Sequence, residues 1–88
     1  MKKATKKEMN QIIKKAGSVN RFYSRWTEVD KKNGTAATFA DVANDLFVSV
    51  KNTDRGIWCN FKSPERQMCG YYNFTEAVSF LNTAMIHA

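Results

Sequence analysis

The sequence has few of the residues that build metal, disulfide and phosphate-loop sites. Its only cysteines are Cys59 and Cys69 and its only histidine is His87, too few for the usual four-ligand zinc site. Its four glycines are isolated from one another, which argues against a glycine-rich loop that cradles phosphate. We therefore expect neither a bound metal nor a cofactor.

Long apolar runs are scarce as well. No stretch approaches the ~20 apolar residues of a membrane-spanning helix. The start Met-Lys-Lys-Ala continues with further lysines and lacks the apolar core of a secretory signal. These features predict a cytoplasmic protein without a membrane partner, whose thiols stay reduced. A disulfide is the alternative if Cys59 and Cys69 meet across neighbouring strands.

The sequence also lacks a recognisable catalytic constellation. His87 is the penultimate residue, no Asp or Glu lies near it in the sequence, and no serine has an evident base partner. We therefore predict a non-enzymatic protein. A small ribonuclease that uses His87 is the remaining enzymatic alternative.

Acidic residues are few where basic residues gather. Ten of the fourteen Lys and Arg residues lie among residues 1–32 with only three acids, a net charge of +7, whereas residues 33–88 carry four bases and five acids. The whole chain carries +6. Such a charge favours polyanions as partners, RNA or DNA above all. The alternative is that positive charge serves only solubility.

The segment from Thr5 to Ala16 has the signals of an amphipathic helix. Thr5 and Glu8 fit a capping box, and Gly17 can end the helix in a left-handed conformation. Apolar residues recur at helical spacing: Met9, Ile12, Ile13 and Ala16. On the opposite side of this helix we expect a row of basic and amide side chains: Lys3, Lys7, Asn10 and Lys14.

Residues 19–30 predict a second helix that Ser18 caps. Their apolar side chains also recur at helical spacing: Val19, Phe22, Tyr23, Trp26 and Val29. The aromatic and β-branched content leaves a strand as the competing interpretation. After a turn at Asn33 and Gly34, residues 38–43 predict a short capped helix.

From Leu46 onward the apolar period changes to two, which is typical of strands. Residues 46–51 and 57–62 predict a hairpin across the polar loop 52–56, and residues 67–72 predict a third strand after a turn at Pro64. A final helix starts near Asn73. The order predicts one small α+β domain, residues 1–88, with N-terminal helices, a three-stranded antiparallel meander and a C-terminal helix.

The meander separates two sets of side chains if Val50 pairs with Ile57 and Phe61 with Met68. One face then holds Leu46, Val48, Val50, Ile57, Cys59, Phe61, Met68 and Tyr72. The other holds Phe47, Ser49, Lys51, Trp58, Asn60, Lys62, Gln67, Cys69 and Tyr71. Aromatics interleaved with lysines and amides are typical of a platform on which single-stranded bases stack. The alternative is that these aromatics lie beneath the helices as core or contact another copy.

The predicted nucleic-acid-binding residues combine the basic N-terminal region with this second face. They are Lys3, Lys7, Lys14, Lys15, Arg21, Arg25, Lys51, Trp58 and Lys62. Charge does not distinguish RNA from DNA, and a solvated basic surface is the alternative for the helical lysines. A second functional reading is an inhibitor or adaptor whose basic face binds an acidic protein.

Three resemblances bear on function. The α-β-β-β-α order is similar to that of double-stranded-RNA-binding domains, but the last helix begins Asn73-Phe74-Thr75-Glu76 without the lysines of that family. Small bacterial mRNA-cleaving toxins share the size and charge, with His87 as the matching residue. In size, charge and its Met-Lys-Lys start, the chain also resembles the small basic early proteins of T-even-type phages. That family includes an RNA-binding inhibitor of the ToxN endoribonuclease toxin. The resemblance implies a counter-defence role in the host cytoplasm with RNA and a toxin nuclease as partners.

Overall fold

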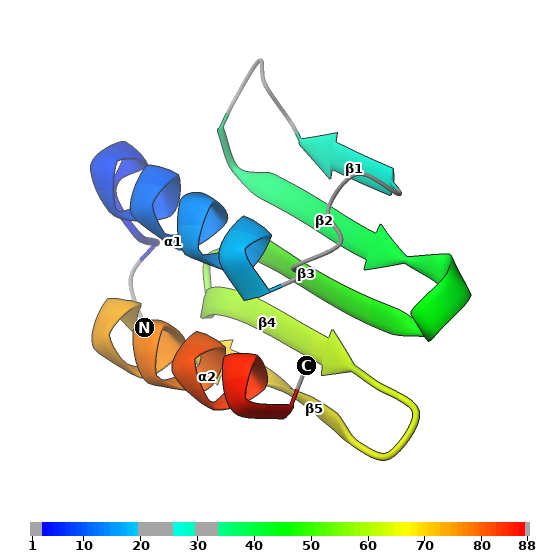
Figure 1. Cartoon of the computed structure of the whole chain (residues 1–88). Coiled ribbons are helices and arrows are strands. Elements are labelled where there is room, and N and C mark those ends of the chain that lie inside the picture. Colours follow the sequence, from blue (N-terminus) through cyan, green and yellow to red (C-terminus); the bar gives the residue numbers. More distant parts are fainter. Residues whose placement is uncertain (1–2, 20–25, 30–33, 88) are drawn as a thin grey trace.

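A computed structural model of the chain describes residues 3–19, 26–29 and 34–87, with the backbone alone described for 26–29. In these ranges the chain forms two α-helices, a short 3₁₀ helix and a five-stranded antiparallel sheet (Figure 1). The elements are α1 (Lys6–Val19), β1 (Trp26–Val29), β2 (Ala36–Asp41), η1 (Val42–Asn44), β3 (Leu46–Thr53), β4 (Gly56–Lys62), β5 (Gln67–Tyr72) and α2 (Phe74–His87). The predicted α+β class is confirmed.

Helix α1 begins where the sequence predicts. The Glu8 carboxylate accepts a hydrogen bond from the Thr5 backbone N–H at 2.9 Å, and the Thr5 hydroxyl accepts one from the Glu8 N–H at 3.1 Å. This is the predicted capping box. The helix continues through Gly17 to Val19, so the predicted stop at Gly17 is wrong. An added Cβ at Gly17 would lie 3.2 Å from the Phe39 ring, so this glycine lets α1 approach β2 closely.

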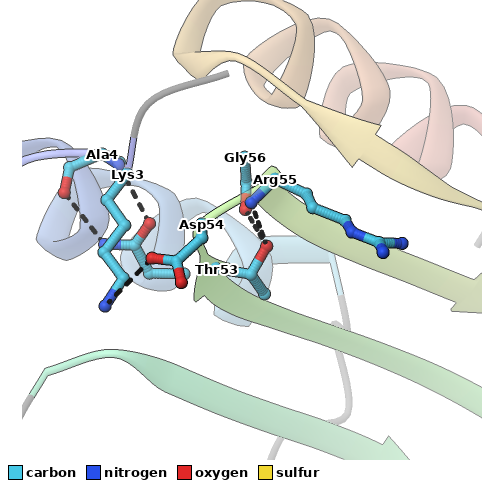
Figure 2. Close-up of polar contacts among 7 residues, drawn as sticks. Lys3, Ala4, Thr53, Asp54, Arg55 and Gly56 are labelled. Carbon is cyan, nitrogen blue, oxygen red and sulfur yellow. Dashed lines mark hydrogen bonds and ion pairs between the residues drawn. The ribbon is translucent and has the colours of Figure 1, made fainter.

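The segment before α1 is fixed to the end of the β3–β4 hairpin. The Ala4 N–H donates to the Asn52 side-chain oxygen, and the Asn52 side-chain nitrogen donates to the Ala4 carbonyl, both at 2.9 Å. Beside this pair, the Lys3 ammonium lies 3.6 Å from an Asp54 carboxylate oxygen (Figure 2). At the hairpin tip, the Thr53 hydroxyl donates to the Gly56 carbonyl at 2.7 Å.

Replacing Asn52 by alanine should lower the free energy of unfolding by about 1–3 kcal/mol, because both Ala4 hydrogen bonds are lost together. Chemical denaturation followed by circular dichroism measures this effect. Asp54→Ala is the matched control, since its exposed ion pair with Lys3 contributes only about 0–1 kcal/mol. Equal losses in both variants would contradict the anchoring role of Asn52.

Two helix predictions in the first half of the chain are wrong. Residues 26–29 of the predicted second helix form strand β1, which pairs with β2, and residues 20–25 and 30 lie outside the described residues. Of the predicted short helix 38–43, residues up to Asp41 belong to strand β2, and only η1 is helical. Within the described ranges the sheet therefore has five strands, two more than the predicted three.

The strands pair in chain order, β1-β2-β3-β4-β5. Val50 pairs with Cys59, so the predicted pairing of Val50 with Ile57 is wrong by two residues. The prediction that Phe61 pairs with Met68 is confirmed. A shift of two residues leaves each side chain on its own face, which is why the predicted division into two faces holds.

Both helices lie side by side on one face of the sheet (Figure 1), where α1 contacts β2 and β3 and α2 contacts β4 and β5. Their apolar stripes and the facing strand residues form the core. Fully buried members include Met9, Ile12, Val48, Val50, Ile57, Cys59, Phe61 and Leu81. Neither helix in the described part of the chain has the length and apolar character that crossing a membrane requires.

Candidate nucleic-acid interface

The face of the sheet away from α1 and α2 carries no helix in the described part of the chain. We call it the open face; from β3, β4 and β5 it presents Phe47, Ser49, Lys51, Trp58, Asn60, Lys62, Gln67, Cys69 and Tyr71. This is the set of residues that alternation predicted. The burial patterns support it, because buried and more exposed positions alternate along β3 and β4.

An aromatic pair lies toward one end of the open face. Lys51, Trp58 and Tyr71 are direct neighbours across β3, β4 and β5. The Trp58 and Tyr71 ring centroids lie 5.0 Å apart with the planes tilted by 52°, and Tyr71 is 42% exposed. The Lys51 side chain is exposed and has no ion-pair partner in the described part of the chain. Two aromatic rings with a free ammonium beside them can stack a base and neutralise its phosphate.

Small polar side chains fill the next cross-strand row. The Thr38 and Ser49 hydroxyls are 3.2 Å apart and hydrogen-bonded, and Ser49 is followed across the sheet by Asn60 and Cys69. The Asn60 side-chain oxygen is buried without a hydrogen-bond partner within the described residues.

The third row combines an aromatic with a paired lysine. Phe47, Lys62 and Gln67 are neighbours across β3, β4 and β5. The Lys62 ammonium lies 3.4 Å from an Asp45 carboxylate oxygen, with both side chains more than half exposed. A surface pair of this kind is worth about 0–1 kcal/mol, so a phosphate can replace Asp45 at little cost.

The basic residues of α1 lie on the other side of the molecule from the open face. Lys7 and Lys14 are exposed on the surface of α1 opposite its buried stripe, and that stripe faces the sheet. Lys15 is half-buried on the flank of the helix. The predicted binding residues are therefore divided between two surfaces with the sheet and the helix layer between them.

The remaining predicted basic residues occupy separate places. Lys3 lies at the tip of the β3–β4 hairpin, where its ammonium pairs with Asp54 (Figure 2). In the same view Arg55 extends away from this cluster. Arg21 and Arg25 lie outside the described residues.

The two cysteines point to opposite faces of the sheet. Cys59 is buried in the core and Cys69 is exposed on the open face, and both are free thiols. Because Cys59 pairs with Gly70 and Cys69 with Asn60, their side chains cannot meet across the two strands. Burial raises the pKa of the Cys59 thiol to about 12, so only Cys69 is available to thiol reagents at neutral pH.

A hollow of about 440 Å³ lies at the end of the sheet where α2 finishes. It is lined by Asn44, Leu46, Ser63, Pro64, Glu65, Arg66 and His87. The fold thus brings Glu65 and Arg66 to the same hollow as His87. Nothing in the sequence indicated this, because His87 lies about 20 residues further along the chain. In the described part of the chain no group of three or more His, Cys, Asp or Glu side chains could hold a metal ion.

Comparison with protein-family models, with curated proteins and with solved structures gives no significant match for this chain.

Proposed function

We propose that the protein binds single-stranded RNA on its open face and catalyses no reaction. The observation that carries this proposal is the Trp58–Tyr71 pair on a sheet face that bears no helix in the described part of the chain, with the exposed ammonium of Lys51, unpaired among the described residues, in the same cross-strand row. Bases must be unpaired to stack on side chains, which favours single strands over duplexes. Each stacked base contributes roughly 1–3 kcal/mol.

The lysines of α1 act differently under this proposal. They face away from the stacking platform, so they contribute to the long-range attraction that a net charge of +6 exerts on a polyanion. Substitution of Lys7 or Lys14 should therefore slow RNA association. Substitution of Lys51 should weaken the bound complex directly.

Fluorescence anisotropy with a labelled single-stranded RNA, repeated across a salt series, tests the proposal. We expect binding that weakens steeply with salt, since phosphate neutralisation releases counterions. A blunt RNA duplex of the same sequence is the control and should bind more weakly. Absence of binding at low salt, or preference for the duplex, would contradict the proposal.

The resemblance to the small early proteins of T-even-type phages suggests where this RNA binding would act. In the cytoplasm of an infected cell, a protein that occupies single-stranded RNA would protect that RNA from an endoribonuclease toxin. Purified toxin should then cut RNA more slowly when this protein is present. Protection that survives the loss of RNA binding would instead indicate direct contact with the toxin.

A second candidate is a protein-binding inhibitor or adaptor. The observation in its favour is the exposed lysine surface of α1, with Lys6, Lys7 and Lys14 and only Glu8 as an acid. Affinity purification with and without nuclease treatment separates the two candidates. Partners that survive RNA digestion favour the second, and partners that disappear favour the first.

The hollow at His87 requires a cleavage control. A histidine, a carboxylate and an arginine are residue types that can act as acid, base and phosphate ligand. We expect the RNA to remain intact during the binding assay. Cleavage that His87→Ala abolishes would establish the ribonuclease alternative.

A further inference from the structure

Strand β5 ends the sheet without the features that usually protect an edge. Its sequence, Gln67-Met68-Cys69-Gly70-Tyr71-Tyr72, contains no charged residue and no proline. It pairs with β4 on one side, and no strand of the described chain pairs with its other side. Natural proteins commonly protect such edges with lysine, proline or a bulge, because an uncharged edge recruits another strand.

The turn before β5 determines which backbone groups are free. The Ser63 N–H donates to the Arg66 carbonyl at 2.8 Å, and the Arg66 N–H donates to the Ser63 carbonyl at 3.4 Å. Hydrogen-bonded and non-hydrogen-bonded pairs alternate along an antiparallel ladder. Met68, Gly70 and Tyr72 therefore bond to β4. The N–H and C=O groups of Gln67, Cys69 and Tyr71 point outward along the edge.

Beside this edge, on the helix side, lies an apolar hollow of about 360 Å³ between β5 and α2. It is lined by Met68, Tyr72, Thr75, Glu76, Ser79, Phe80 and Thr83. The rings of Tyr72 and Phe80, two of these lining residues, lie 5.3 Å apart. Tyr72 also covers Gly70 so closely that an added Cβ there would lie 2.7 Å from the Tyr72 hydroxyl. An unpaired edge and an apolar hollow thus adjoin each other.

We propose that β5 pairs antiparallel with β5 of a second copy of this chain, forming a two-fold symmetric dimer with one continuous sheet. A second copy fits because the strand is uncharged and its outward groups are self-complementary. When Cys69 lies opposite Cys69 of the partner subunit, Gln67 lies opposite the partner's Tyr71. Every outward N–H and C=O of Gln67, Cys69 and Tyr71 then has a partner. Any other register that keeps the faces aligned leaves some of these groups unpaired.

The spacing of the helices also favours a second copy of this chain as the partner of β5. Helix α1 lies over β2 and β3, and α2 lies over β4 and β5, so neighbouring helices are two strands apart. Two strand spacings are about 10 Å, close to the separation of packed helices. Pairing β5 with its copy places the second α2 at about the same distance from the first. The apolar hollow then lies between the two α2 helices.

This dimer would also join two open faces. Tyr71 lies on the paired strand with Trp58 next to it on β4, so the two aromatic pairs would belong to one surface that a single RNA strand can cross. That consequence depends on the proposed RNA binding. The dimer itself does not.

Sedimentation equilibrium of the full chain, without RNA, tests the proposal. The chain should be dimeric, and Cys69→Lys should weaken dimerisation by roughly a hundredfold or more, because two ammonium groups would meet at the two-fold axis. Cys69→Ser is the matched control and should remain dimeric. A chain that stays monomeric throughout the concentration series, or a dimer that Cys69→Lys leaves unchanged, would overturn the proposal.

Thiol cross-linking gives a second readout of the register. Diamide should oxidise the two facing Cys69 thiols to one disulfide, its azo group taking up two electrons and two protons. A covalent dimer that Cys69→Ser abolishes supports this register, since Cys59 is buried. A covalent dimer that persists in Cys69→Ser would contradict it. Trp58→Ala should weaken RNA binding and keep the dimer, which separates this proposal from the preceding one.

Discussion

Replacing Trp58 by alanine should lower the affinity for single-stranded RNA by roughly tenfold to a hundredfold. The indole is the larger ring of the aromatic pair on the open face, and a stacked base is worth roughly 1–3 kcal/mol. Anisotropy titration with a short labelled RNA measures this effect. Tyr71→Ala should weaken binding as well, and the double variant should bind least.

The control for this prediction is Trp58→Phe, which retains a ring and should keep most of the affinity. Circular dichroism must show that Trp58→Ala is folded, because the variant loses the ring contact with Tyr71, worth about 0.5–1.5 kcal/mol, and also the buried part of the indole. If folded Trp58→Ala binds RNA as tightly as the parent chain, the open face is not the binding surface.

Replacing Phe61 by alanine should lower the free energy of unfolding by about 3–5 kcal/mol, the usual cost of removing a buried phenylalanine. Phe61 is 1% exposed and belongs to the core that β4 and the other strands form with the helices. Domains of this size have a total stability of roughly 5–10 kcal/mol. The variant should therefore lose about a third or more of its stability. Thermal and denaturant unfolding measure this loss.

Phe47 provides the matched control for this second prediction. It lies on the adjacent strand, one residue from Phe61's partner Val48, but its side chain is on the open face and only partly buried. Phe47→Ala should cost less than half as much as Phe61→Ala. Equal costs would mean that the open face is packed as a second core, which contradicts its use as a binding surface.

Local signals in the sequence predicted the parts of the fold that depend on neighbouring residues. The capping box joins Thr5 and Glu8, which are three residues apart. The alternation along β3 and β4 can be read from consecutive residues. The register of the β3–β4 hairpin was predicted wrongly because Asn52 makes its contacts with a residue far away in the sequence. Asn52 has the polarity of a loop residue, but it belongs to β3 and its amide is satisfied by the backbone of Ala4.

The first half of the chain shows how tertiary pairing overrides a helical pattern. Trp26 and Val29 fit the spacing of apolar residues in a helix, yet residues 26–29 pair with β2. This pairing satisfies the hydrogen bonds of the backbone N–H and C=O groups, and the spacing of apolar side chains carries no information about such pairing. Likewise Phe39 reaches the core from a strand and packs against Gly17, a glycine that the sequence indicated as a helix end.

The sequence predicted the part of the candidate site that lies on the strands, because alternation along a strand is a local signal. Period-two alternation alone assigns Lys51, Trp58 and Lys62 to one face, and the structure places them there. The charge count grouped the lysines of α1 with them, because a count of charges does not show on which side of the sheet a helix lies. The hollow that gathers Glu65, Arg66 and His87 depends on the path of the whole chain and left no signal in the sequence.

In the proposed binding mode RNA lies on the open face and not on the lysines of α1. Titration of the ¹⁵N-labelled full chain with a short single-stranded RNA, followed by amide and side-chain chemical shifts, tests it directly. We expect the largest shifts at Trp58, Tyr71 and Lys51, with the exposed surface of α1 little changed. Shifts centred on Lys7 and Lys14 with an unchanged Trp58 indole would contradict the account.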